Sequence, residues 1–228
     1  MCHLSFRSHI LIQTNINPGQ EGDNMYYYDL PVNIRSMRYR FPPYIDFYFP
    51  EITGMSDARI QQSMNNQIIQ MMNRLIAQFD RPDLTTYITG SFLIKANEEN
   101  VLSMVLHALG DFGGAHPMTY IGALNFDVLT GESKSLSSQF KPGSDYVKRL
   151  SDMVAEQIKE REIPVLDEFK EINPEQNFYV ADNVLILYYD LYDLSPYAAG
   201  FPYFPIPLYK IQDIIAEDSL LDRLTYVI

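Results

Sequence analysis

The sequence has one cysteine, Cys2, and no tryptophan among its 228 residues. A single cysteine excludes an intramolecular disulfide framework and a thiolate metal cluster. Long hydrophobic runs are also missing, and the N-terminus lacks the basic region, the extended apolar region and the small-residue cleavage site of a signal peptide. The residues alone therefore predict no transmembrane segment and leave the cellular compartment unknown.

Basic residues are scarce, because 17 Lys and Arg stand against 29 Asp and Glu, which gives a formal net charge of −12. Binding to nucleic acid depends on neutralising phosphates, so this charge disfavours a nucleic-acid partner. It favours a cationic partner, although it also serves simply to keep a small domain soluble. With 46% hydrophobic residues, the chain is nevertheless able to bury an ordinary core.

The motifs of common enzyme classes are missing as well. Residues 111–113 read DFG, the metal-binding tripeptide of protein kinases, but no glycine-rich loop, strand lysine or catalytic loop accompanies them. No serine elbow occurs, and the histidines lack a metal-ligand spacing. We therefore expect no catalytic residue, no metal and no cofactor. Asp190 and Asp193 keep one alternative open, a glycan hydrolase that draws a second carboxylate from elsewhere in the chain.

Apolar periodicity predicts an α+β fold. Strict alternation predicts strands over 32–40, 44–49, 85–95, 101–108 and 118–128, and the last three are expected to form an antiparallel meander. In the fifth of these strands, Gly122 leaves a gap in a row of large apolar side chains. The spacing of apolar residues changes to three and four between the second and third strands, which indicates a helix.

Two amphipathic helices are predicted. Ser56 can cap a helix that reaches Phe79, and Ser144 can cap another that ends near Arg161. We expect a final strong strand over 183–193, then a proline-rich edge strand and a short helix over 209–216.

The predicted elements form antiparallel sheets with helices packed on one face, in two closely associated subdomains. Residues 1–25 are rich in polar and turn-forming residues towards their end and are expected to form an irregular N-terminal arm. Residues 26–97 are expected to form an N-terminal α+β subdomain, and residues 98–228 a C-terminal α+β subdomain.

Two segments are candidates for a binding surface. GDFGGAHPM, residues 110–118, is expected to be a hairpin turn in which His116 either pins the loop or contacts a partner. The second segment surrounds several prolines and a glycine, and its aromatic residues are candidates because such rings are enriched at binding surfaces. Core packing accounts for about half of them on general grounds. The candidate partner-binding residues are His116, Tyr192, Tyr197, Phe201 and Tyr203.

Several motifs, in the same order, resemble a bacterial domain pair. The pair forms the extracellular region of RsiV-type anti-sigma factors, which sense lysozyme, and the N-terminal region of PdaC-type peptidoglycan deacetylases. The resemblance extends from about residue 32 to residue 215. The motifs are FPEITG (49–54), MNNQI (64–68), FGGAH (112–116), LNFDVLTGE (124–132), FYVAD (178–182), PYAAG (196–200) and IP (206–207).

The resemblance implies a non-catalytic binding module at the cell envelope, whose partner is a cationic lysozyme-like protein or the glycan of peptidoglycan. It also implies an extracytoplasmic location, although no signal peptide is visible in the chain. The anti-sigma factors' membrane helix and the deacetylases' catalytic domain have no counterpart here, so neither activity carries over whole. A stand-alone intracellular or spore-associated structural or assembly protein remains an alternative to the binding module, as does the glycan hydrolase.

Overall fold

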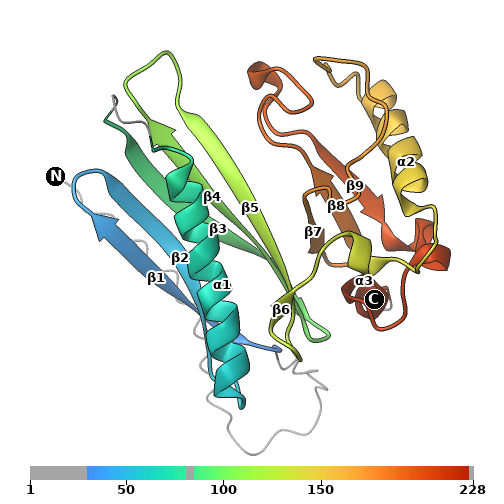
Figure 1. Ribbon diagram of the computed structural model, residues 1–228, viewed down its shortest axis with the longest axis horizontal. Coiled ribbons are helices and arrows are strands. Elements are labelled where there is room, and N and C mark those ends of the chain that lie inside the picture. Colours follow the sequence, from blue (N-terminus) through green and yellow to red (C-terminus); the bar gives the residue numbers. More distant parts are fainter. Residues whose placement is uncertain (1–29, 81–84, 226–228) are drawn as a thin grey trace, which may run out of the picture.

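The computed structural model describes residues 30–80 and 85–225, and Figure 1 shows two sheets with helices on their outer sides. The predicted arm, residues 1–25, lies outside the described residues. The α+β fold with mostly antiparallel sheets is confirmed. The larger sheet has six strands, which are β1 (Asn33–Phe41), β2 (Ile45–Thr53), β3 (Tyr87–Glu98), β4 (Val101–Asp111), β5 (Met118–Asp127) and β6 (Glu132–Ser133).

The six strands lie in the sheet in the order in which they occur in the sequence. β3, β4 and β5 pair antiparallel, so the predicted meander is confirmed. β2 and β3 are parallel, because the chain between them crosses one face of the sheet as the helix α1 (Ala58–Ala77). The expected boundary between residues 97 and 98 falls within the last residues of β3, inside this sheet.

Helix α1 covers one face of the larger sheet. It begins one residue later than the sequence indicated, because the Asp57 carboxylate, and not Ser56, accepts hydrogen bonds from the first backbone N–H groups of the helix. The helix side chains pack closely because glycines make room for them. The Met71 side chain fills the gap at Gly122, where an added Cβ would lie 2.2 Å from its sulfur. The buried helix residues are Met64, Ile68, Met72 and Leu75.

The smaller sheet has three antiparallel strands in sequence order, β7 (Phe178–Ala181), β8 (Val184–Tyr188) and β9 (Tyr203–Pro207). Helix α2 (Tyr146–Glu160) packs on one face of this sheet, and the short helix α3 (Leu220–Leu224) closes one end of the same core. The second predicted amphipathic helix is therefore confirmed within two residues at its ends.

Strand β8 ends at Tyr188, so the expected strand over 183–193 is too long. The pairing with β9 extends as far as Tyr189, which donates its N–H to Pro202 O at 3.2 Å. Tyr192 has a φ of +71°, which turns the chain away from the sheet. The short helix expected over 209–216 is also wrong. Two 3₁₀ turns, Leu208–Lys210 and Gln212–Ile214, occupy that segment, because burying a residue at every third position suits three residues per turn.

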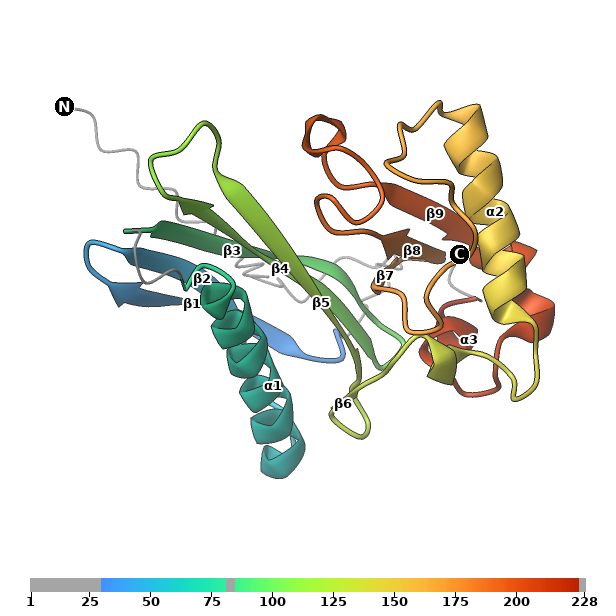
Figure 2. The same ribbon diagram turned by 45° about the horizontal axis from the view of Figure 1, so that its top comes forward.

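The smaller sheet packs on the larger one through its edge strand β7, with α1 and α2 on the outside (Figure 2). Strand β7 contacts β3, β4 and β5, and the contact is polar. The Ser103 hydroxyl donates to Asn125 Oδ1 at 2.7 Å and accepts the N–H of Val180 at 3.0 Å. Asn125 Nδ2 in turn donates to Phe178 O at 2.9 Å. These hydrogen bonds fix the position of the smaller sheet on the larger one.

Candidate functional site

The loop from β4 to β5 meets the loop from β8 to β9 at one end of the molecule. The rings of His116 and Tyr197 stack with centroids 4.0 Å apart, and the Tyr197 hydroxyl donates to Pro117 O at 2.8 Å. Tyr192 lies beside Tyr197, with ring centroids 5.8 Å apart. Three of the five residues predicted from the sequence are therefore in one cluster, although 76 or more positions separate His116 from the other two.

The His116 loop has the geometry of a tight turn. Asp111 Oδ1 accepts the N–H of Gly113 at 2.8 Å, and Gly113 has a φ of +70°, which favours glycine. The His116 ring is exposed and contacts the other loop, so it does more than close its own turn.

The other two predicted residues lie in a second aromatic cluster, on the face of the smaller sheet that meets the larger one. Phe201 and Tyr203 have ring centroids 6.4 Å apart, and Tyr203 also lies 6.3 Å from both Tyr179 and Tyr188. Tyr188 is buried, whereas Tyr203 is 36% exposed. We use the name tyrosine loop surface for His116, Tyr192, Tyr197, Phe201 and Tyr203.

Tyr179 belongs to the second cluster but is not among the residues predicted from the sequence. The Lys95 ammonium lies 4.9 Å from the centre of its ring, and burial raises the pKa of its hydroxyl. The alternation of residues 178–181 could have placed Tyr179 on the same face as Ala181, opposite the buried Phe178 and Val180. The alternation does not indicate that this face contacts a lysine from β3.

Asp190 is the most perturbed carboxyl group near these tyrosines. Burial, together with the charge of Asp193, raises its pKa to about 6. Asn177 Nδ2 donates to Asp190 Oδ2 at 3.4 Å, and the buried Oδ1 has no hydrogen-bond partner in the described residues. Asp190 and Asp193 lie on one turn, in which Asp193 donates its N–H to Asp190 O at 3.2 Å, and not on a strand as the sequence indicated.

One further polar pair lies on the larger sheet. Ser91 Oγ and His107 Nε2 are in hydrogen-bond contact at 2.7 Å, and burial, with the charge of Lys95, lowers the pKa of His107. Within residues 30–80 and 85–225, no group of three or more His, Cys, Asp or Glu side chains is placed to hold a metal ion. Among the described helices, none is both long enough and apolar enough to cross a membrane.

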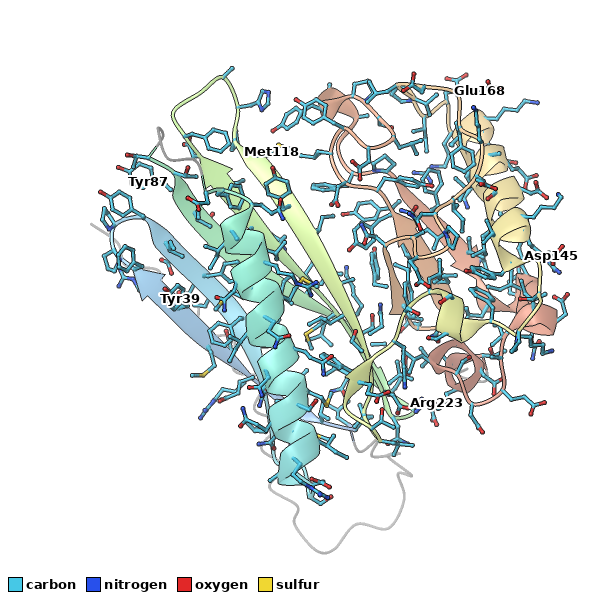
Figure 3. The ribbon with its side chains drawn as sticks, viewed as in Figure 1. Tyr39, Tyr87, Met118, Asp145, Glu168 and Arg223 are labelled. Carbon is cyan, nitrogen blue, oxygen red and sulfur yellow. The ribbon has the colours of Figure 1, made fainter. Side chains whose placement is uncertain are left out.

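Two segments near the tyrosine loop surface are rich in acidic residues. The segment 161–175 contains five acidic and two basic residues, and the segment 189–201 contains two acidic residues and no basic one. The two segments lie side by side, because Leu166 donates its N–H to Leu194 O at 2.9 Å. In Figure 3, the labelled Glu168 and Met118 mark the same end of the molecule, where this surface lies.

Residues 139–209 match the family model described as "Protein of unknown function (DUF3298)". Among curated proteins, the chain is similar to the anti-sigma-V factor RsiV of Bacillus subtilis (strain 168). The two are 25% identical over 193 residues, which cover 78% of this chain and 67% of RsiV. The predicted resemblance to RsiV-type proteins is confirmed.

Two solved structures share the fold. A DUF3298 family member from Bacteroides fragilis has a TM-score of 0.66 at 14% identity and covers 87% of this chain and 99% of its own. A DUF3298 family protein from Pseudomonas aeruginosa has a TM-score of 0.58 at 14% identity, and it covers 83% of this chain and 95% of its own. The similarity to an anti-sigma factor favours a non-catalytic sensing or binding module over an enzyme.

Proposed function

We propose that this protein is a non-catalytic binding module of the bacterial cell envelope, which works outside the cytoplasm and recognises a cationic, lysozyme-like protein. Similarity to an anti-sigma factor supports a regulatory protein with a protein partner. The proposal therefore concerns recognition, and it assigns no catalytic role to any residue.

The observation that carries the proposal is the combination of exposed tyrosines and acidic neighbours on one surface. Tyr192 is 48% exposed and Tyr203 36% exposed, although large apolar rings are usually buried. The segments 161–175 and 189–201 are rich in acidic residues and lie side by side, and the labelled Glu168 is at the same end of the molecule as this surface (Figure 3). A cationic protein is drawn to such a surface by its charge, and the rings then supply contact area at a low cost in conformational entropy.

Isothermal titration with a cationic lysozyme tests the proposal. We expect binding heat at low salt and weaker binding at moderate salt, because salt screens attraction between exposed charges. Tyr192→Ala and Tyr197→Ala are each expected to weaken binding by about tenfold, as is typical for aromatic residues at the centre of an interface. Tyr209→Ala is the control, because Tyr209 is 72% exposed but lies outside the tyrosine loop surface.

The glycan of peptidoglycan is the second candidate partner, favoured by the same exposed rings, since sugar rings stack on aromatic faces. Titration with soluble peptidoglycan fragments separates the two partners. A structural or assembly protein binds neither, so the absence of heat with both partners would contradict the proposal. A glycan hydrolase shortens the fragments during incubation, and Asp190→Asn then abolishes the shortening.

A further inference from the structure

Four strands form the edges of the two sheets, and three of these edges are closed. Strand β6 has only two residues, so it offers little backbone for further pairing. Strand β7 bonds through its outer backbone groups to Ser103 and Asn125 of the larger sheet. In β9, Arg161 and Gln157 donate to backbone carbonyls at 2.6 Å and 3.0 Å, and two of the five residues are proline. Edges are closed in such ways because unpaired strand backbone recruits another strand.

The fourth edge, strand β1, is open. It has nine residues in continuous register with β2, and it contains neither a bulge nor a proline. Beyond that pairing, the backbone of residues 33–40 makes no hydrogen bond to any other described residue. Helix α1 packs mainly on β2, β4 and β5, and in Figure 3 the labelled Tyr39 lies on the side of the molecule away from the smaller sheet. The edge therefore offers a row of unpaired N–H and C=O groups to another strand.

The side chains of β1 do not close this edge. Arg35 Nε donates to Glu51 Oε2 at 2.9 Å. Arg38 Nε donates to Asp46 Oδ1 at 2.7 Å, so both guanidinium groups are directed to β2 and not to the open edge. Two aromatic rings of β1 are exposed as well, at 41% for residue 39 and 58% for residue 41. Unpaired backbone and exposed apolar rings together are the features through which strands associate.

The arginines decide how a second copy of the chain can pair at this edge. Two copies related by a two-fold axis pair antiparallel, and all nine residues find a partner only when Met37, the middle residue, lies opposite itself. Arg35 then faces Tyr39 of the second copy, and Arg38 faces Ser36 of the second copy. No arginine faces another in this register, whereas an axis at Arg38 would bring two like charges directly together.

We propose that two copies of this protein associate through antiparallel pairing of their β1 strands, in the register centred on Met37. The pairing joins the two larger sheets into one continuous sheet and covers Tyr39 and Phe41. It leaves the tyrosine loop surface of each copy free, because the loops from β4 to β5 and from β8 to β9 lie beyond β2 and β3 from this edge (Figure 1). The dimer presents that surface twice, and its formation does not depend on what the surface binds.

Sedimentation equilibrium of the full chain tests the proposal. We expect the wild type to form a dimer as its concentration rises. Met37→Arg and Met37→Glu each place two like charges at the axis, and each is expected to weaken the dimer by at least about fivefold. An equimolar mixture of the two variants is expected to restore association, because arginine then faces glutamate. Restoration by mixing identifies a residue that lies opposite its own copy.

Leu93→Arg and Leu93→Glu are the matched controls. Leu93 is also exposed, at 52%, but it lies in β3, inside the sheet. Both variants are expected to dimerise like the wild type. If thermal unfolding shows that the Met37 variants do not fold, Tyr39→Arg decides, because it places an arginine opposite Arg35 twice in the dimer. An unchanged dimer of Tyr39→Arg would then contradict the proposed register.

Four results would overturn the proposal. The first is a wild type that stays monomeric at concentrations up to about 1 mM. The others are unchanged dimerisation of folded Met37 variants, equal weakening by the Leu93 variants, and a mixture of the Met37 variants that does not associate. A monomeric wild type excludes the second copy as the occupant of this edge, whether another protein or a segment outside the described residues then covers it.

Discussion

The two faces of the six-stranded sheet are covered in different ways. Helix α1 covers one face with apolar side chains, and there the packing is so close that an added Cβ at Gly90 would lie 2.2 Å from the Phe47 ring. The smaller sheet covers part of the other face through hydrogen bonds, with Ser103, Asn125 and the Tyr188 hydroxyl at the contact. Tyr48 and Leu93 on that face remain exposed.

The difference shows how stability and geometry are divided in this fold. Apolar packing is strong but tolerates small shifts, whereas a buried hydrogen bond is satisfied in only one arrangement. The helix face therefore supplies much of the stability, and the polar face sets the position of the smaller sheet. That position in turn decides whether the Tyr197 loop reaches His116.

The largest expected effect is at the helix face. Gly90→Ala is expected to lower the free energy of unfolding by about 3 kcal/mol, because the new methyl group overlaps the Phe47 ring, which is completely buried. Urea denaturation measures the loss. Gly114→Ala is the control, since no atom lies within 4 Å of its added Cβ, and an equal loss there would argue against the packing explanation.

The next effect is at the polar face. Asn125→Leu is expected to lower the free energy of unfolding by about 2 kcal/mol, because it leaves the Ser103 hydroxyl and the Phe178 carbonyl buried with fewer partners. The same variant is expected to disturb the contact of His116 with Tyr197, which the ring signals of the two residues report by NMR. A loss of stability with unchanged ring signals would mean that the contact between the sheets does not determine the contact between His116 and Tyr197.

A smaller effect is expected for Tyr188→Phe. The buried hydroxyl accepts the N–H of Ala123 at 3.1 Å, and its removal is expected to cost about 1 kcal/mol by urea denaturation. Tyr209→Phe is the matched control, because that side chain is 72% exposed. Similar losses for both variants would mean that the hydrogen bond between the sheets contributes little.

The smallest effect depends on pH. Burial raises the pKa of Asp190 to about 6, so between about pH 4 and pH 6 the unfolded chain loses this proton while the folded protein keeps it. As pH rises through this window, the free energy of unfolding of the wild type therefore falls. Above the window the contribution of Asp190 stays constant. We expect about 1 kcal/mol, reduced by partial exposure of the carboxyl group.

Urea denaturation of the wild type and of Asp190→Asn, from pH 4 to pH 8, measures this contribution. Asp190→Asn is expected to be the more stable of the two near pH 7, and the difference between them is expected to shrink below pH 5. The comparison removes the opposing contribution of His107, whose lowered pKa makes stability rise with pH in both proteins. A difference that stays constant with pH would contradict the assignment to Asp190.

The sequence was sufficient to predict most of the local structure. Alternation defined the meander from β3 to β5, and a spacing of three and four defined α1 and α2, because burial of one face imposes these periods on any sheet or helix that covers a core. Residues 189–193 were misassigned to a strand, since their apolar alternation continues past the point where Tyr192 turns the chain. The apolar pattern indicates which residues are buried, but it does not indicate where a strand ends.

The binding surface depended much more on tertiary structure. The sequence indicated the candidate tyrosines and the acidic charge, because both are properties of the residues themselves. Only the packing of the two sheets brought His116 to Tyr197 and Lys95 to Tyr179. Contacts between residues far apart in the sequence are fixed by how faces dock, and periodicity within single elements carries no information about that docking.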